Sequence, residues 1–164
     1  STELVIVVFG AVGGANLYFD VLQQFKQDGK LDWQDAVLIK KNSFGDAEIE
    51  QTEDPQGGEG ALAGALAGAL VGLLGGPLGV LVGMATGAAA GSAAAEGLDT
   101  GISEGVLSGV SARMKAETSA FVGLIDASLV DALQKIQTSL EGTSDAFFFH
   151  QPVNTSAVEK FKRG

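Results

Sequence analysis

The chain has 164 residues, with 20 acidic and 10 basic side chains, so its formal net charge is -10. It contains no cysteine, which excludes disulfides, thiol nucleophiles, iron–sulfur clusters and the usual structural zinc sites. The acidic balance repels phosphate groups, so nucleic acid is not an expected partner. A hydrophobic fraction of 46% against 18% charged residues is typical of a folded protein, and the length predicts one domain, with or without an insertion.

The first elements of the chain are a strand and a helix. Residues 4–9 are a β-branched apolar run that ends at Gly10, which is typical of a strand buried on both faces. Asn16 can cap a helix that Gly29 ends. The apolar face expected for this helix has helical spacing: Leu17, Val21, Leu22 and Phe25.

Two further strands follow and are expected to form a hairpin. Residues 36–39 predict the first strand, and Asn42-Ser-Phe-Gly45 predicts the turn. In residues 46–50 the acids at 46, 48 and 50 alternate with Ala47 and Ile49, which predicts a third strand with a solvated acidic face.

The last third of the chain repeats this order. Ile102, Val106, Leu107 and Val110 predict an amphipathic helix, and residues 120–125 predict a strand. A helix follows and is expected to end at Gly142, before a last strand at 146–149. The apolar face of that helix is Leu129, Val130, Leu133, Ile136 and Leu140.

The predicted fold is α+β. Two strand-helix-strand units suggest a small ferredoxin-like sandwich formed by residues 1–56 and 98–164. Residues 57–97 are expected to be inserted into this head domain.

The inserted segment has two series of glycines and no charged side chain between Gly60 and Ala95. Residues four apart lie on one face of a helix, so each series forms a seam along which another backbone can approach closely. Gly75-Gly-Pro77 at the midpoint predicts a helical hairpin with arms at about 60–74 and 78–95. The residues predicted to carry self-association are Gly60, Gly64, Gly68, Gly72, Gly76, Gly79, Gly83, Gly87 and Gly91.

These glycines are costly in a helix. Each costs about 1 kcal/mol relative to alanine, so eight or nine of them cost about 8 kcal/mol, comparable with the stability of a small domain. A flexible linker would be polar and aperiodic, whereas Leu62, Leu66 and Leu70 form a regular stripe. The cost must therefore be offset by close packing against other helices or by lipid.

Packing in a homo-oligomer and insertion in a membrane both remain open for this hairpin. Arms of about 23 and 27 Å are just shorter than the ~30 Å core of a bilayer. The flanks hold acids such as Glu59 and Glu96, and no Lys, Arg, Trp or Tyr anchors. The short arms and the lack of interfacial anchors favour packing between identical subunits over insertion in a membrane.

The chain resembles the bacterial family catalogued as domain of unknown function 1269, from the first strand to about Leu140. The resemblance rests on Leu31-Asp-Trp-Gln-Asp-Ala-Val37, Lys40-Lys41, Glu48-Ile-Glu-Gln51, Gly75-Gly-Pro-Leu-Gly79, Gly97-Leu-Asp99 and Thr118-Ser-Ala-Phe121. It implies an uncharacterised protein associated with membranes through the glycine segment, and it implies no catalytic motif. One departure is Gly10-Ala-Val-Gly-Gly14, where the resemblance implies an acidic turn.

Two groups of residues offer chemistry that has to be weighed against a structural role. Residues 10–16 form a glycine-rich loop between strand and helix, a place where phosphates bind, but they match neither dinucleotide nor Walker patterns, so a tight turn is favoured. Asp46, Glu48, Glu50, Glu53 and Asp54 supply oxygen ligands for Ca²⁺ or Mg²⁺ but are spread along a strand, which favours a solvated face.

The C-terminal part offers a histidine and a basic tail. His150 follows three phenylalanines and has no partner motif for general base catalysis, so the aromatic run is interpreted as core and interface. The basic tail consists of Lys160, Lys162 and Arg163 around Phe161. Three interpretations of it are open: contact with a lipid headgroup, contact with the acidic strand of a neighbouring subunit, or a solvated tail.

The sequence therefore predicts a non-enzymatic structural protein that self-assembles through its glycine-zipper hairpin into a homo-oligomer, extended as a filament or tube. The alternative is a membrane-associated protein whose hairpin enters the bilayer. Glu3 stands where an export signal would carry basic residues, so a cytoplasmic location is expected. For the membrane-associated alternative, the expected location is at the inner face of the cytoplasmic membrane or inserted in it. No catalytic, cofactor-binding or metal-binding residue is predicted, and the expected partner is the protein itself.

Overall fold

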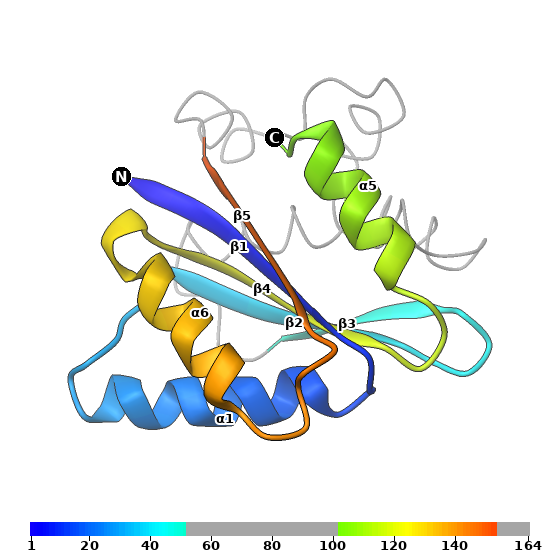
Figure 1. The fold of residues 1–164 in the computed structure, drawn as a ribbon, viewed down its shortest axis with the longest axis horizontal. Coiled ribbons are helices and arrows are strands. Elements are labelled where there is room, and N and C mark those ends of the chain that lie inside the picture. The colour runs from blue at the N-terminus through cyan, green and yellow to red at the C-terminus, as the bar shows by residue number, and fades with distance from the viewer. Residues whose placement is uncertain (52–101, 154–164) are drawn as a thin grey trace.

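A computed structural model describes residues 1–51 and 102–153 of the chain. These residues form one five-stranded antiparallel sheet with helices on both faces (Figure 1). The sequence predicts an α+β fold, and its combination of helices with an antiparallel sheet is confirmed. In chain order the elements are β1 (Thr2–Phe9), α1 (Gly14–Gln27), β2 (Asp35–Lys41), β3 (Ala47–Gln51), α5 (Glu104–Arg113), β4 (Ser119–Asp126), the 3-10 turn η1 (Ala127–Leu129), α6 (Val130–Ser139) and β5 (Phe147–Pro152).

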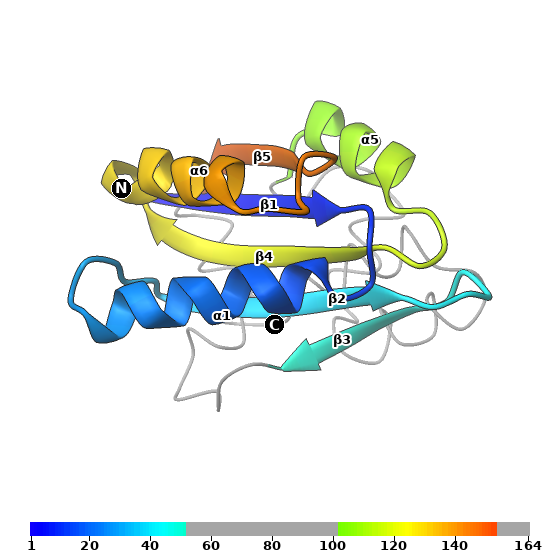
Figure 2. The same ribbon diagram turned by 60° about the horizontal axis from the view of Figure 1, so that its bottom comes forward.

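The strand order of the sheet is β3-β2-β4-β1-β5, and every neighbouring pair is antiparallel (Figure 2). Helix α1 connects β1 and β2, which lie on either side of β4. Helix α6 connects β4 and β5, which lie on either side of β1. The two helices therefore join strands that are not hydrogen-bonded to each other, and β3 is an edge strand added by a hairpin.

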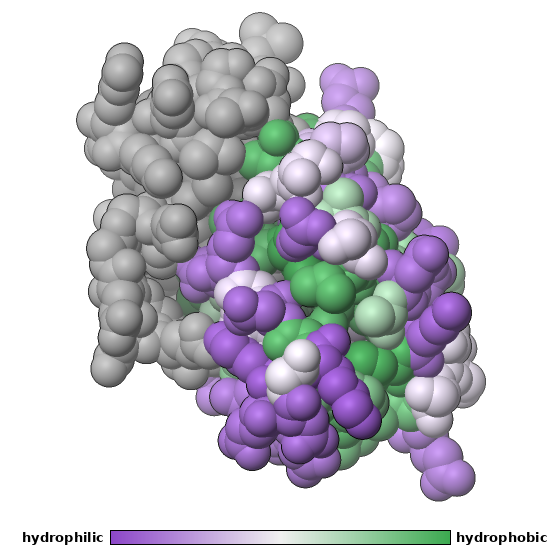
Figure 3. Space-filling model, turned by 90° about the vertical axis from the view of Figure 1, so that its left-hand side faces the viewer, coloured by the Kyte–Doolittle hydropathy of each residue, from purple (hydrophilic) through white to green (hydrophobic). Residues whose placement is uncertain are grey.

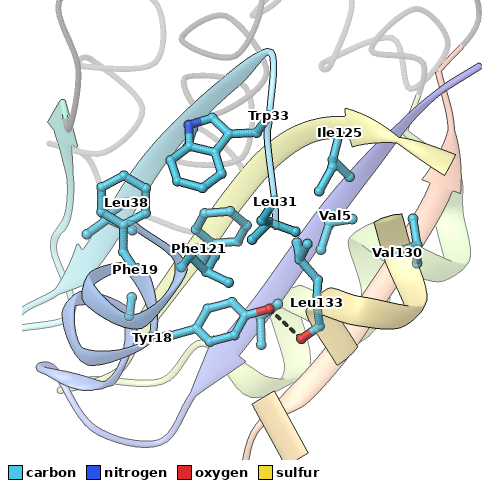
Figure 4. Close-up of a cluster of buried hydrophobic side chains, with 14 of the residues drawn as sticks. Val5, Tyr18, Phe19, Leu31, Trp33, Leu38, Phe121, Ile125, Val130 and Leu133 are labelled. Carbon is cyan, nitrogen blue, oxygen red and sulfur yellow. Dashed lines mark hydrogen bonds between the residues drawn. The ribbon is translucent and has the colours of Figure 1, made fainter. Parts of the chain in front are cut away.

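Helices α1 and α6 cover one face of the sheet, and an aromatic cluster fills the space between (Figure 4). Tyr18 packs against Phe121 with ring centroids 5.4 Å apart, and Phe19 packs against Trp33 at 5.5 Å. The buried Tyr18 hydroxyl donates a 2.8 Å hydrogen bond to the carbonyl oxygen of Leu133, so its polar atom has a partner inside the core. This bond ties α1 to α6.

Helix α5 lies on the opposite face of the sheet, against β1 and β5. Its Val110 is fully buried, and Met114, just after the helix, packs in the same cluster. Both faces of β1 are therefore covered, which confirms the doubly buried strand predicted for residues 4–9.

All five predicted strands are present, and two glycines end elements as expected. Gly29 follows α1 with φ of 73°, and Gly45 lies in the β2–β3 turn with φ of 85°. Glycine is favoured at both positions because side chains rarely adopt this left-handed conformation.

Two predictions about α1 are wrong. Asn16 does not cap the helix, because α1 begins at Gly14 and Asn16 lies inside its first turn. Leu17 is 48% exposed, because the face turned to the sheet carries other residues. The buried residues of α1 are Ala15, Tyr18, Phe19 and Leu22.

Candidate functional site

The glycines predicted for self-association, Gly60 to Gly91, lie outside the described residues, but the structure shows where that segment is attached. It follows Gln51 at the end of β3 and precedes Ile102, which lies just before α5, is 7% exposed and packs in the core on the α5 face of the sheet. The backbone amide of Ser103 donates a 2.7 Å hydrogen bond to the Gln151 side chain, so this attachment point lies beside the end of β5.

The glycine-rich loop of residues 10–16 is a closed turn. The hydroxyl of Ser119 accepts a 3.0 Å hydrogen bond from the amide of Ala15 and donates a 2.7 Å bond to the carbonyl of Ala11. The Gly14 amide also donates a hydrogen bond, to the carbonyl oxygen of Ala11 at 3.1 Å. The side chain of Asp145 lies directly beside Gly10. A phosphate here would meet amides already in use and a neighbouring carboxylate, so the geometry favours the tight turn.

Ser119 is a residue that the sequence interpretation missed. It is the first residue of β4 and is fully buried. Its hydroxyl nevertheless accepts a hydrogen bond from a backbone amide in the first turn of α1, a helix that begins 105 positions earlier. A serine inside a strand gives no local sign of such a role, because helix caps are normally sought next to the helix they serve.

The acidic face predicted for 46–50 is solvated. Glu48 and Glu50 are exposed, and Glu50 forms a 3.2 Å ion pair with Lys40 on the neighbouring strand. Within residues 1–51 and 102–153, no three metal-ligating side chains come together in a group that could hold an ion. Glu53 and Asp54 lie outside the described residues. Glutamates on an edge strand also discourage pairing with a foreign strand.

His150 contacts the side chain of Glu3. Its Nδ1 atom lies 2.7 Å from a carboxylate oxygen of Glu3, and the contact joins β5 to β1. Phe148 and Phe149 pack into the clusters on opposite faces of the sheet, as expected for core aromatics. The basic residues at 160–163 lie outside the described residues.

Among residues 1–51 and 102–153, Tyr18 and Asp126 have shifted pKa values, and both shifts have structural causes. Burial raises the pKa of the Tyr18 hydroxyl above its ordinary value of 10.0. Hydrogen bonds from the Ser128 side chain and backbone lower the pKa of Asp126, which caps the η1 turn. Neither shift indicates a catalytic acid or base.

Hydrophobic surface is visible at the end of the molecule where the N-terminus lies, between hydrophilic side chains (Figure 3). In the described part of the chain, no helix combines the length and the hydropathy needed to cross a bilayer.

Comparison with known proteins identifies the family and no function. No curated protein and no solved structure matches the chain. A family described as a protein of unknown function (DUF1269) matches residues 61–151, more than half of the chain. The match includes the glycine segment together with α5, β4, α6 and most of β5, whereas the resembling motifs before residue 61 lie outside it. The chain belongs to the DUF1269 family.

Proposed function

We propose that this protein is a non-enzymatic structural protein that self-assembles into a homo-oligomer through close packing of a glycine-zipper hairpin at residues 57–97. The observation that carries the proposal is the pair of glycine series, four residues apart, in a stretch without any charge between Gly60 and Ala95. Two glycine seams reduce the distance between backbones, and identical seams on identical subunits are self-complementary.

The head domain supports this proposal as a scaffold. We interpret β1, α1, β2, β4, α6 and β5 as a ferredoxin-like unit, because their order, with each helix joining strands separated by a third, is that of two interleaved strand-helix-strand units. In this interpretation β3, the hairpin and α5 are additions between the second and third strands of the unit. The hairpin would then be held at both of its ends by the same sheet.

A non-enzymatic role is favoured by how the polar groups of the described residues are used. The loop that could hold a phosphate is closed by Ser119, and His150 is engaged by Glu3. We propose that the protein acts in the cytoplasm with itself as partner, and we assign it no cofactor.

The test is negative-stain microscopy and sedimentation of the full chain, purified without detergent. The wild type should form large particles. The double variant Gly68→Leu/Gly83→Leu should reduce them, because bulky side chains on the seams separate the backbones. Ala63→Leu is the matched control, since helical spacing places residue 63 among Leu66 and Leu70, away from the seam. A monomeric wild type would overturn the proposal.

The second candidate function is a membrane-associated protein whose hairpin enters the bilayer. It is supported by the length of each expected arm, about 23 to 27 Å, which approaches the ~30 Å thickness of the bilayer core. Carbonate extraction separates the two functions. Protein that stays in the membrane pellet until detergent is added supports insertion, and the two leucine substitutions should leave that retention unchanged.

A further inference from the structure

The described sheet has two edge strands, β3 and β5, which lie on opposite sides of it (Figure 2). Strand β3 carries Glu48 and Glu50, and charged side chains on an edge discourage pairing with another strand. Strand β5 reads Phe-Phe-Phe-His-Gln-Pro, so it has no Asp, Glu, Lys or Arg, and its proline is the last residue. Within the described residues, β5 is paired on one side only, with β1. It is therefore the less protected of the two edges.

The register of β5 shows which of its backbone groups point away from the sheet. The Val153 amide donates a 3.0 Å hydrogen bond to the Thr2 carbonyl. In an antiparallel pair, residues that bond to the neighbouring strand alternate with residues whose N–H and C=O groups point outward. Every second residue before Val153 therefore bonds to β1, and the outward groups belong to the residues between them. These are Phe148, His150 and Pro152, of which proline has no N–H.

We propose that β5 pairs with β5 of a second copy, antiparallel and about a twofold axis at Phe149. Antiparallel pairing of one edge with an identical edge is self-complementary. With this axis, Phe148 of one copy lies opposite His150 of the other, and the two such pairs use all four outward N–H groups and all four outward C=O groups of these residues. An axis at Phe148 or His150 would leave a carbonyl without a donor, because the Ala146 amide is already bonded and Pro152 has none.

Local charges favour this contact, although the net charge of -10 opposes the approach of any two copies. Helix α5 runs antiparallel to β5. The Ser103 amide, just before the helix, bonds to the Gln151 side chain at 2.7 Å. The Arg113 guanidinium, at the end of the helix, lies 3.6 Å from the centroid of the Phe147 ring. A twofold axis at the centre of β5 therefore brings Arg113 of each copy level with Glu104 of the other, which is a complementary arrangement.

Helix α5 also leaves room for the second copy. It lies against β1 and β5, so its twofold mate would lie about two strand spacings away, roughly 10 Å, a distance at which helices pack. Gly109 faces β5, because a Cβ there would lie 2.6 Å from Phe149. Gly105 and Ala112 share this helix face and are exposed. Small residues on this face let the two helices approach each other without a clash.

The inference goes beyond the proposed function and does not rest on it, because β5 shares no residue with the glycine-zipper segment 57–97. A copy that uses both contacts can bind two others, which allows an assembly to grow beyond a dimer.

Proline at position 150 gives the sharpest test, because it removes an outward N–H and no hydrogen bond to β1. The background is the full-length variant Gly68→Leu/Gly83→Leu, in which hairpin packing is blocked. Sedimentation velocity should show a dimer in this background, and His150→Pro should weaken dimerisation at least tenfold. His150→Ala is the matched control, because it loses the same side chain and the contact with Glu3 but keeps the N–H, and it should remain a dimer. Equal thermal midpoints for the two variants verify the fold.

Amide hydrogen exchange in the same background gives a second measurement that needs no change in β5. In the dimer the outward amides of Phe148 and His150 should be protected to the same degree as the Phe149 amide, which bonds to β1. Dilution that dissociates the dimer should remove this protection from the two outward amides and leave it at Phe149.

Three results would overturn the β5 pairing: a monomer in the glycine variant background, a dimer that His150→Pro leaves intact, or rapid exchange of the two outward amides at every protein concentration. Protection of these amides in a monomer would identify a segment of the same chain as the occupant of the edge, and also overturns it. Hairpin assembly is judged separately, by the large particles of the wild type and their loss in Gly68→Leu/Gly83→Leu.

Discussion

Replacing Ser119 with alanine tests whether one side chain of β4 holds the start of α1. The Ser119 hydroxyl has two hydrogen bonds, from the Ala15 amide at 3.0 Å and to the Ala11 carbonyl at 2.7 Å. Ser119 and Ala15 are both fully buried, so water cannot replace the lost partner of the Ala15 amide. Ala11 is exposed, and its carbonyl can be rehydrated.

The expected loss of stability follows from the different exposure of the two groups that bond to Ser119, the buried Ala15 amide and the exposed Ala11 carbonyl. A buried donor left without a partner costs about 1–3 kcal/mol, and the solvent-accessible acceptor adds little. We therefore expect Ser119→Ala to lower the free energy of unfolding by about 2 kcal/mol, roughly a 30-fold change in the folding equilibrium. For a chain of this length the melting temperature should fall by about 4–8 °C.

Urea denaturation measures this change, with Ser139→Ala as the matched control. The Ser139 hydroxyl is exposed and donates only to the carbonyl of Ile136 within its own helix, so its loss should change stability by less than about 0.5 kcal/mol. For Ser119→Ala the urea concentration at the midpoint of unfolding should fall, while the dependence of the free energy of unfolding on urea concentration stays unchanged. Equal midpoints for the two variants would refute the assignment of Ser119 as the cap of α1.

Two further substitutions test the core. Tyr18 is the single tyrosine, and burial raises its pKa above 10.0, so the stability that its neutral hydroxyl provides is present below pH 10 and lost as the pH rises above 10. Tyr18→Phe should cost about 1 kcal/mol at pH 7 by removing the bond to Leu133, and thermal melts from pH 9 to 12 should show a steeper alkaline loss in the wild type. In α5, Gly105→Ala should raise stability by about 0.5–1 kcal/mol, because a Cβ there meets nothing within 4 Å. Gly109→Ala should lower it by about 1 kcal/mol in urea denaturation, because its Cβ would lie 2.6 Å from Phe149, and equal gains for both variants would contradict this packing.

The strands could be predicted from the sequence because apolar runs and turn glycines are local signals. Residues 4–9 and 120–125 have no charge and a high β-branched or aromatic content, and both became central strands. Gly29 and Gly45 ended their elements because the requirement for a left-handed residue is also local. The edge strand β3 was recognised from its alternating glutamates.

The start and the buried face of α1 could not be predicted because both depend on contacts with β4 and α6. Residues 17, 21 and 25 share one helical stripe, and residues 15, 18, 19 and 22 share another, so periodicity alone allowed two apolar faces. The second stripe is buried: Tyr18 packs against Phe121 of β4 and donates a hydrogen bond to Leu133 of α6, two contacts that the sequence does not show. The helix start is likewise determined by Ser119, and Asn16 is therefore not needed as a cap.

The glycines predicted for self-association stand out in the sequence because their spacing is a local signal, but they lie outside the described residues. The contact between Ser119 and the start of α1 has no such local signal, because the pairing of β1 with β4 brings the two together.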